Sequence, residues 1–419
     1  MSERFAPPRG TQDLLPPTSD RLEVLASEAA RLARAFGYRR VETPTFEHTE
    51  LFARGVGETT DIVTKEMYTF QDKGGRSLTL RPEGTTGVVR AYLGNRQGLP
   101  TPFKGYYVAP MFRHERPQAG RMRQHTQFGI EVIGTPAPDA DAEVIAVGHR
   151  FLSRWGLSFE LRVNSIGDPV CRPAYREALL AFLRERRDRL SADCRERMEE
   201  NPLRVLDCKV PSCREATAEA PSILDFLDQA CREHFEAVLE RLDEQGIEHA
   251  LDPRLVRGLD YYTRTAFEFV SPDLGPTQST LCGGGRYDGL AEAIGGPATP
   301  GIGFGLGLER VLLAMERAGL VPPETPGTTV FVVALGDEAG REGRALARAL
   351  RDEGIPAEHA LEPRPLGAQL KMADRAGAAY AAILGDDELA AGEVTMRDME
   401  TGEQERVKTE GVASWLTSR

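Results

Sequence analysis

Long apolar runs are absent from this sequence. No segment of its 419 residues approaches the roughly 20 consecutive apolar residues that a membrane span needs. The first residues also lack the apolar stretch of a secretory signal peptide. We therefore expect a cytoplasmic protein with no membrane association.

Cysteine is scarce and scattered along the chain. The six cysteines form neither a Cys-x-x-Cys pair nor a closely spaced Cys/His set, which are the usual sequence signs of zinc. They are Cys171, Cys194, Cys208, Cys213, Cys231 and Cys282. The sequence therefore predicts reduced, mostly structural thiols and no zinc.

Basic residues are in the minority. Lysine and arginine total 52 against 64 aspartates and glutamates, for a formal net charge of -12. Because phosphate contacts supply much of the affinity of nucleic-acid-binding proteins, this balance argues mildly against a nucleic-acid binder. Any such contact must rest on local basic patches.

The common nucleotide-binding loops are missing as well. There is no G-x-x-x-x-G-K-[ST] phosphate loop, and the glycine-rich segment Gly301–Arg310 has no register that fits G-x-G-x-x-G. Two interpretations of this segment stay open. Either its glycines form a purely structural strand, or they allow close backbone approach before Arg310, at the start of an apolar helix, meets a polyphosphate.

The chain is too long for one hydrophobic core, since single domains rarely exceed about 250–300 residues. Residues 169–246 change to charged helical segments, and residues 328–419 alternate strand and helix after a turn-rich linker near Pro323. We expect a first domain built from residues 1–168 and 247–321, a helical insertion at 169–246, and a separate α/β domain at 328–419.

Hydrophobic spacing predicts the elements of the first domain. The apolar residues of Thr18–Phe36 recur at helical spacing, and the strand that follows ends at Pro44. Residues 104–133 are typical of two strands joined by a polar loop. One face of the second strand is expected to hold Arg121, Arg123, His125, Gln127 and Glu131, opposite Phe128, Ile130 and Val132. That face suits polar ligands.

Several segments resemble class II aminoacyl-tRNA synthetases. Phe112–Glu115 resembles motif 2, Gly305–Arg310 resembles motif 3, and the helix and strand that end at Pro44 fit motif 1. Within that class, the resemblance is to the histidyl-tRNA synthetase family and runs over almost the whole chain. The segments that carry it are Leu80–Thr85, Glu115–Gln118, Arg257–Arg264, Leu281–Asp288 and Leu370–Asp374.

This resemblance implies an α+β catalytic core of class II synthetase type with an antiparallel sheet, a helical insertion, a C-terminal anticodon-binding α/β domain, and a homodimer formed through motif 1. The implied activity is ATP-dependent activation of L-histidine to histidyl-adenylate and transfer to the 3′ end of tRNA(His), with Mg2+ accompanying ATP. The alternative is a noncatalytic, histidine-binding regulatory paralogue of ATP phosphoribosyltransferase. Such paralogues typically lack the anticodon-binding domain and lose motif residues. In this sequence the C-terminal domain and the motif residues are both present.

Three arginines are implied to be catalytic. By resemblance, Arg113 and Arg257 approach the α-phosphate of ATP from opposite sides and Arg310 holds the γ-phosphate. A planar, permanently charged guanidinium suits negative charge that grows on phosphate oxygens. Glu115 and His125 join Arg113 and Arg310 in the implied ATP site. For any one arginine alone, a surface ion pair would be the commoner role.

The implied histidine pocket combines carboxylates with neutral polar groups. The residues that match family positions for the ammonium group are Glu83, Thr85 and Gln127. Those that match positions for the imidazole are Glu131 and Tyr262. Tyr261 and Tyr287 complete the wall, the alternative being ordinary core aromatics.

Contacts with tRNA are implied in two places. Arg116, Gln118 and Arg123 lie in or beside the motif 2 loop, where the family meets the acceptor end of tRNA, although a solvated loop explains them equally well. The second place is a helix that carries Arg341, Arg344, Arg348 and Arg351, which could equally be one solvated face.

The sequence departs from the family pattern at His114, Met122 and His125, where tyrosine or phenylalanine is usual. These departures put the stacking on adenine in doubt. Histidine can still stack and methionine can cover a ring, so we expect altered ATP affinity rather than lost activity.

Overall fold

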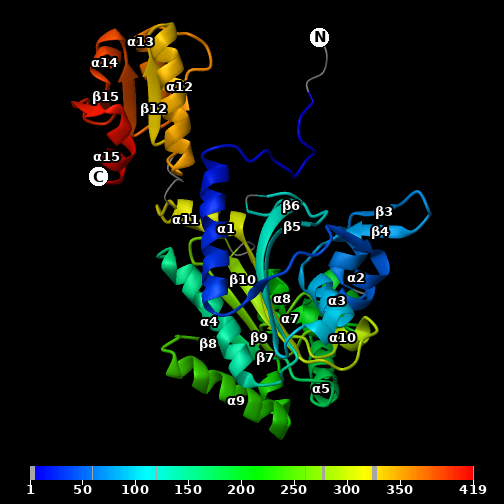
Figure 1. Ribbon diagram of the computed structural model, residues 1–419. Coiled ribbons are helices and arrows are strands. Elements are labelled where there is room, and N and C mark those ends of the chain that lie inside the picture. Colours follow the sequence, from blue (N-terminus) through cyan, green and yellow to red (C-terminus); the bar gives the residue numbers. More distant parts are fainter. Residues whose placement is uncertain are drawn as a thin grey trace. The chain divides into compact units, whose positions relative to one another are not determined.

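The computed structural model consists of two units, Met1–Pro323 and Glu324–Arg419 (Figure 1). It describes residues 5–58, 60–118, 120–259, 261–275, 279–322 and 328–418. Most of the turn-rich linker predicted near Pro323 lies outside these residues. Within the described ranges, no helix has the length and apolar character to cross a membrane.

An eight-stranded sheet forms the centre of the first unit. Its strand order is β1-β5-β6-β11-β10-β9-β7-β8. The bounds are β1 (Arg39–Arg40), β5 (Phe103–Phe112), β6 (Gln124–Ile133), β7 (Glu160–Ser165), β8 (Ala250–Leu251), β9 (Thr263–Val270), β10 (Thr280–Arg286) and β11 (Gly301–Gly307). Strands from β5 to β7 in this order are antiparallel, which confirms the predicted antiparallel sheet, whereas β1 and β8 pair in parallel at the two edges.

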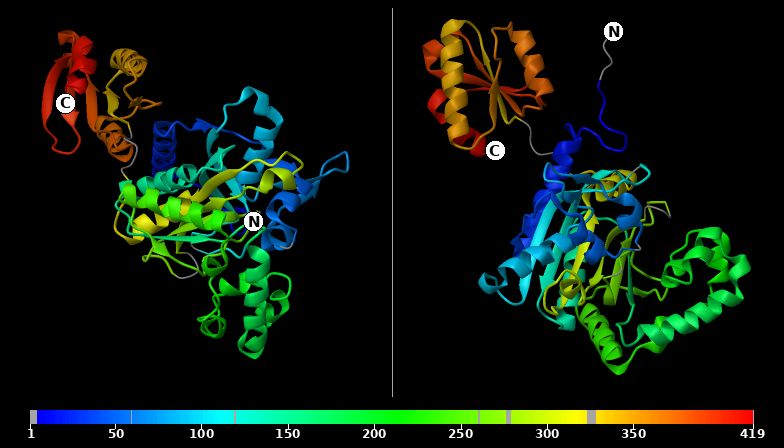
Figure 2. Two further views of the ribbon diagram at one scale, coloured as in Figure 1. Left: turned by 90° about the horizontal axis from the view of Figure 1, so that it is seen from below. Right: turned by 90° about the vertical axis from the view of Figure 1, so that its right-hand side faces the viewer.

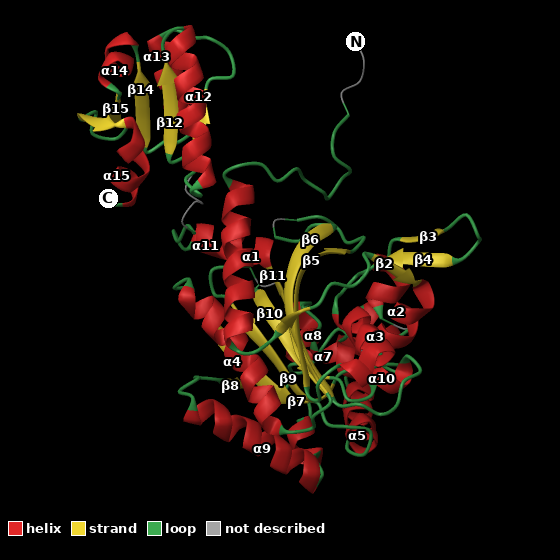
Figure 3. Cartoon of the chain, in the orientation of Figure 1, coloured by secondary structure: helices red, strands yellow, loops and turns green. Residues whose placement is uncertain are grey.

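Long helices cover one face of this sheet (Figure 3). They are α1 (Thr18–Ala35), α4 (Pro138–Arg154), α9 (Gln229–Glu244) and α11 (Leu308–Arg317). Their apolar stripes pack on Phe128, Ile130 and Val132 of β6, the face that period-two alternation predicted to be apolar. The other face of β6 is thereby left to the polar side chains.

The helix α1 has nearly the bounds that helical spacing predicted. Its buried stripe includes Leu22, Leu25 and Leu32. Burial of one leucine side chain contributes about 1.5–3 kcal/mol, so this stripe fixes the helix on the core. Gly37, at φ 82°, allows the turn that leads into the short β1.

Smaller elements lie on the opposite face. They are the strands β2 (Phe46–His48), β3 (Thr69–Gln71) and β4 (Ser77–Leu80), the helices α2 (Thr49–Val56), α3 (Thr85–Asn95) and α10 (Leu290–Ala293), and the short turns η1 (Ile62–Glu66) and η2 (Arg96–Gly98). Side chains of α3 and α10 pack with Tyr107 and Met111 of β5. This layer forms one wall of the functional site.

Pro110 lies inside β5, although proline cannot donate a ladder hydrogen bond. Its strand is paired on one side by β6, where Pro110 opposes Thr126, and on the other side by β1 only at Gly105 and Tyr106. At position 110 the strand is therefore locally an edge, where proline is tolerated.

A helical cluster follows β7 and projects from the side of the sheet (Figure 2). It contains α5 (Arg172–Glu185), η3 (Arg187–Arg189), α6 (Ala192–Arg197), α7 (Leu203–Leu206), α8 (Pro211–Ala216) and η4 (Ile223–Phe226). These elements share a small core of their own. The following helix α9 instead places Phe235, Val238 and Leu242 in the main core.

The second unit is an α/β fold around a five-stranded sheet of order β13-β12-β14-β15-β16. Its strands are β12 (Val330–Ala334), β13 (Ala357–His359), β14 (Tyr380–Leu384), β15 (Glu393–Asp398) and β16 (Gln404–Lys408). Its helical elements are α12 (Asp337–Asp352), α13 (Leu366–Arg375), α14 (Asp386–Ala391), η5 (Thr409–Gly411) and α15 (Val412–Thr417). The first three strands of the order are parallel and the last two antiparallel, which agrees with the predicted alternation up to β15.

Candidate active site

A cavity of about 200 Å³ lies over the middle strands of the large sheet, on the face opposite the long helices. Strands β5, β6, β10 and β11 form its floor, and the start of α3 and the segment before β9 form its walls. The predicted site residues that line it are Glu83, Thr85, Arg113, Glu115, His125, Gln127, Arg257, Tyr261, Tyr262 and Arg310. The fold thus brings together residues from five separate parts of the chain.

The glycines of β10 and β11 make room for the side chains of this cavity. A Cβ atom at Gly303 would overlap the carboxylate of Glu131, one at Gly305 would overlap the amide of Gln127, and one at Gly283 would overlap Arg257. On its other face β11 turns Ile302, Phe304 and Leu306 into the main core. The glycine-rich segment is therefore a sheet strand whose glycines permit close approach, and Arg310 follows in the first turn of α11.

Arg257 is held rigidly at the cavity wall. It forms an ion pair with Glu268 of β9, and its guanidinium carbon lies 5.4 Å from the ring centre of Tyr262. Burial acts to lower the pKa of Arg257, but Tyr262 and Glu268 outweigh it and raise the pKa above its usual value. Its buried Nε atom has no hydrogen-bond partner among the described residues.

Arg113 and Arg310 approach from other sides. Arg113 Nε donates to the Pro82 carbonyl oxygen at 2.8 Å, and Arg310 Nη1 donates to the Thr280 carbonyl oxygen at 2.8 Å. Burial lowers the pKa of Arg310, and the positive charges of Arg121 and Arg113 lower it further. An anion between these guanidinium groups would relieve that repulsion.

Glu83 and Thr85 meet at the start of α3. The two carboxylate oxygens of Glu83 accept hydrogen bonds from the backbone N–H groups of Thr85 and Thr86, at 2.7 and 3.0 Å. A negative charge at a helix N-terminus is stabilised by the helix dipole. The cavity therefore has an oriented carboxylate that can receive an ammonium group.

Glu131 and Tyr287 lie beneath the pocket wall rather than in the lining of the cavity. Tyr287 Oη donates to Glu131 at 2.5 Å, and Thr85 Oγ1 donates to it at 2.7 Å. Burial raises the pKa of Glu131 to about 8, although these hydrogen bonds act to lower it. A cation at the pocket base would favour the ionised carboxylate.

Comparison with known proteins decides the family of this chain. The model of the family described as "Histidyl-tRNA synthetase" matches residues 10–311, and that of the "Anticodon binding domain" matches residues 329–419. The chain belongs to the histidyl-tRNA synthetase family. The family resemblance seen in the sequence motifs is confirmed, and so are the class II fold and its anticodon-binding domain.

Relatives in this family match the chain over nearly its full length. The histidine–tRNA ligase of Desulfitobacterium hafniense (strain DSM 10664 / DCB-2) is 53% identical over 399 residues, covering 95% of this chain and 94% of that protein. The histidine–tRNA ligase of Acetivibrio thermocellus is 48% identical over 411 residues, covering 98% of each. The crystal structure of apo histidyl-tRNA synthetase from S. aureus matches with a TM-score of 0.82 at 39% identity, covering 99% of this chain and 100% of that one.

The three departures from the histidyl-tRNA synthetase pattern have different surroundings. His125 and Met122 line the cavity, whereas His114 is exposed and packs edge-to-face on Tyr68, with ring centres 5.4 Å apart. Burial, together with Arg113 and Arg310, lowers the pKa of His125 to about 3. His125 is therefore neutral at physiological pH, which leaves its ring suitable for stacking.

Several residues that line the cavity were missing from the predicted site of this family member, among them Tyr107, Arg121 and Glu309. Period-two alternation had already placed Arg121 beside His125 and Gln127, so a signal for it existed. Glu309 accepts the Thr126 N–H with both oxygens, at 2.8 and 2.9 Å, and burial raises its pKa. No sequence pattern distinguished Tyr107 from the core aromatics.

The predicted acceptor-end residues lie outside the cavity lining. Arg116 and Gln118 are exposed, as both a tRNA-contacting loop and a solvated loop require. Arg123 is half-buried, and its guanidinium donates to the carbonyl oxygens of Glu115 and Arg9, each at 3.2 Å. Arg123 therefore already ties the loop to the N-terminal segment.

Proposed function

We propose that this chain is a histidine–tRNA ligase that converts L-histidine and ATP to histidyl-adenylate and pyrophosphate, and then transfers the histidyl group to the 3′ end of tRNA(His). The observation that carries this proposal is the convergence of Arg113, Arg257 and Arg310 on one cavity that also holds the oriented carboxylate of Glu83. The names of the relatives support the same activity.

In the first step, a histidine carboxylate oxygen bonds to the α-phosphorus of ATP and pyrophosphate leaves. We assign Arg113 and Arg257 to the α-phosphate and Arg310 to the γ-phosphate. Each guanidinium is already held by protein oxygens, so little reorganisation is needed as negative charge grows. Glu115 and His125 complete the ATP site, with His125 covering the adenine.

Histidine recognition requires a pocket for an ammonium group and an imidazole. We assign Glu83, Thr85 and Gln127 to the ammonium group, and Glu131 and Tyr262 to the imidazole. Tyr261 and Tyr287 enclose the ring, and Tyr287 also holds Glu131 in place. A site that hydrogen-bonds its substrate rejects analogues lacking that group by roughly 10⁴–10⁵, so this pocket needs no editing domain.

Magnesium is expected with ATP. Besides Glu83, which we assign to the ammonium group, the carboxylates that line the cavity are those of Glu115 and Glu309, and oxygen ligands are those that Mg2+ prefers. Burial raises the pKa of Glu309, which is the effect of a carboxylate without a cationic partner. We propose that these two residues hold Mg2+, which supplies positive charge to the phosphates when bound.

The parts of the chain are assigned as follows. Residues 1–168 and 247–321 form the catalytic core, residues 169–246 form a helical insertion whose last helix packs on that core, and residues 328–419 bind the anticodon. We further assign Arg116, Gln118 and Arg123 to the acceptor end. The arginines of α12, from Arg341 to Arg351, are all exposed and supply the local basic patch that an acidic protein needs.

We propose a homodimer formed through motif 1. The edge strand β1 pairs on one side only, through Arg39 and Arg40, among the described residues. Beside it lies a groove of about 670 Å³ between residues 37–42, 88–95 and 99–104. None of the described cysteines of the chain forms a disulfide, which agrees with a protein that acts in the reducing cytoplasm.

Histidine-dependent exchange of labelled pyrophosphate into ATP tests the proposed activity. The expected result is exchange with histidine and with no other amino acid, followed by charging of tRNA in a mixture of total tRNA. A noncatalytic regulatory paralogue would bind histidine without exchange, and no observation favours it. Absence of exchange by the pure, folded protein would overturn the proposal.

A further inference from the structure

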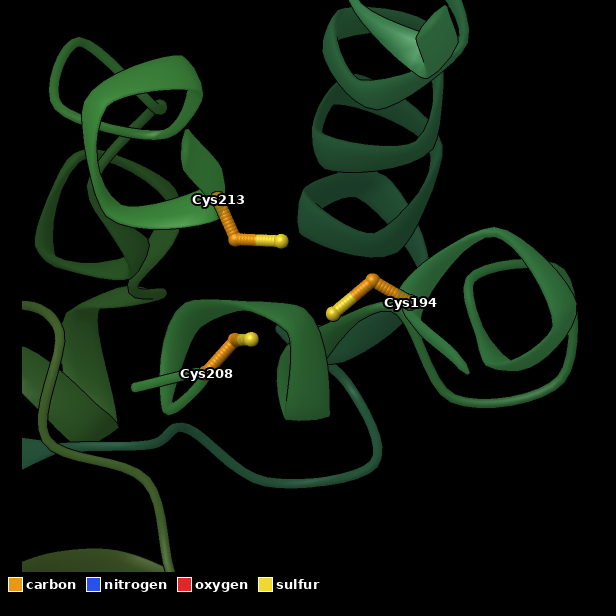
Figure 4. A group of neighbouring side chains, drawn as sticks. All are labelled: Cys194, Cys208 and Cys213. Atoms are coloured by element: carbon orange, nitrogen blue, oxygen red, sulfur yellow. The ribbon is translucent and has the colours of Figure 1, made fainter. Parts of the chain in front are cut away.

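Three cysteines from successive short helices and the loop between them meet in the helical cluster after β7. Cys194 lies on α6, Cys208 follows α7, and Cys213 lies on α8. Their sulfur atoms all lie within 4.8 Å of one another and point into one shared space (Figure 4). None of the three forms a disulfide. This convergence is separate from the cavity described above.

The spacing of the sulfur atoms suits a metal ion. Zinc–sulfur bonds of about 2.3 Å in a tetrahedron place sulfur atoms about 3.8 Å apart. Side chains whose sulfurs lie within 4.8 Å need to close by at most about 1 Å to reach that geometry. Thiolates are soft ligands that select zinc over magnesium or calcium. Cys208 is only half-buried, which leaves a path for the ion to enter.

One sulfur atom of the group already accepts a backbone hydrogen bond. Cys213 Sγ accepts the backbone N–H of Ser191 at 3.1 Å. Burial acts to raise the pKa of Cys213, but this hydrogen bond and those from the neighbouring thiols outweigh it and lower the pKa. Burial raises the pKa of Cys194 to about 12, with Cys208 and Cys213 acting in the same direction. A cation is what would let all three thiols ionise together.

The cluster that these cysteines join has a small core of its own. The helices α6, α7 and α8 contain six, four and six residues, too short to be stable by themselves. Cys194 and Cys213 are buried in the cluster's small core. Small cores of this kind are commonly stabilised by a disulfide or a structural metal.

A second group, with Asp168, Cys171, Asp228 and Cys231, has a different explanation. Asp168 accepts the N–H of Cys171 at 3.2 Å, and Asp228 accepts the N–H of Cys231 at 2.8 Å. Both carboxylates therefore stabilise the first turns of α5 and α9. The three-cysteine group contains no carboxylate, and within it Cys213 Sγ accepts the N–H of Ser191, the N-cap residue of α6.

We propose that Cys194, Cys208 and Cys213 bind one zinc ion as thiolates and that this ion fastens α6, α7 and α8 together. Binding replaces three S–H bonds with three S–Zn bonds and releases three protons. No fourth His, Cys, Asp or Glu of the described residues joins the group, so water takes the remaining position. This departs from the sequence-based expectation of no zinc, which rested on the missing Cys-x-x-Cys spacing.

Metal content of the full-length protein tests the proposal directly. Protein prepared with zinc and without chelator is analysed for metal by mass spectrometry, beside the variants Cys194→Ser, Cys208→Ser, Cys213→Ser and the control Cys231→Ala. We expect about one zinc per chain in the wild type and in Cys231→Ala, and at least a fivefold loss in each of the three serine variants. Cys231 is a matched control because it lies in the same small core.

Loss of zinc from Cys231→Ala would place the ion in the second group and overturn the proposal, as would zinc retained by a triple serine variant. Protein that stays free of zinc, or that carries a disulfide between two of the three cysteines, would also overturn it.

A measurement on the wild type covers the case in which the variants fail to fold. Replacement of zinc by Co2+ should produce the intense near-ultraviolet absorption of cobalt–thiolate bonds, and a chelator should lower the temperature of unfolding. Cobalt binding without thiolate absorption would contradict the assignment of these ligands.

Discussion

Two groups of arginines in this chain have different surroundings. Arg113, Arg257 and Arg310 come from separate segments and line one cavity, where protein oxygens hold each of them. The arginines of α12, from Arg341 to Arg351, follow one helix and are all exposed. The charge of an exposed guanidinium is screened by water and salt, so its exact position has little effect on binding. A guanidinium held in a cavity stabilises only a charge that lies where the fold has placed it.

Arg310 also carries an electrostatic cost. Burial and the neighbouring positive charges lower the pKa of Arg310. A phosphate chain would remove that cost on binding, and charge that grows during the reaction would remove more of it. The comparison therefore separates the charges that we propose to act in catalysis from those that we propose to attract tRNA.

The largest expected effect is on Arg257. The substitution Arg257→Ala removes a fixed positive charge from the α-phosphate, so histidine-dependent pyrophosphate exchange should fall by about 10²–10³-fold or more. Histidine binding, measured by calorimetry, should weaken only modestly. The exposed Arg76, paired with Asp72, supplies the control Arg76→Ala, which should keep normal exchange. Near-normal exchange by Arg257→Ala would contradict the assigned role.

A second expected effect concerns Glu131, the most deeply buried carboxyl of the site. Its pKa of about 8 in the folded protein lies above the ordinary 4.5, so between these values the folded protein keeps a proton that the unfolded chain has lost. The free energy of unfolding should therefore fall as pH rises from about 4.5 to about 8, and then level off.

Glu131→Gln is neutral at every pH and lacks this contribution. We would measure the free energy of unfolding of variant and wild type by urea denaturation at about pH 5 and about pH 8. Relative to the wild type, the variant should be about 1–3 kcal/mol more stable at the higher pH than at the lower one. A difference that is the same at both pH values would show that Glu131 is ionised in the folded protein.

The exposed arginines of α12 should give a smaller effect of another kind. The double substitution Arg341→Ala and Arg344→Ala should raise the KM for tRNA in aminoacylation by about three- to tenfold and reduce its salt dependence. Pyrophosphate exchange, which does not involve tRNA, should stay unchanged. If variant and wild type aminoacylate tRNA equally well at low salt and at high salt, the arginines of α12 form a solvated helix face without a role in tRNA binding.

The smallest expected effect is on His125. Replacement by the phenylalanine usual in the family should change the KM for ATP by a few-fold, which corresponds to about 0.5–1.5 kcal/mol of ring stacking. The comparison variant is His114→Phe, which should leave the KM for ATP unchanged because His114 packs on Tyr68 outside the cavity. An unchanged KM in His125→Phe would refute a role in ATP binding.

Much of the site followed from sequence because its residues lie in recognisable motifs on regular strands. The alternation along β6 placed His125 and Gln127 on the functional face, and both line the cavity. Tyr107 was not predicted, because the sequence pattern of a buried strand is the same whether its aromatic residue faces a core or a ligand. Glu131, Thr85 and Tyr287 were predicted as pocket residues, but the burial of Glu131 by the other two was not, since it depends on three elements packing together.

The sequence by itself determined the family, the class of fold, the α1 stripe and the set of charged residues from which the site is built, because motif spacing and hydrophobic periodicity are local properties of the chain. Only the tertiary structure decided which arginines are buried, which carboxyl keeps its proton, and that Cys194, Cys208 and Cys213 meet. Burial and convergence depend on contacts between segments far apart in sequence, and no local pattern records them.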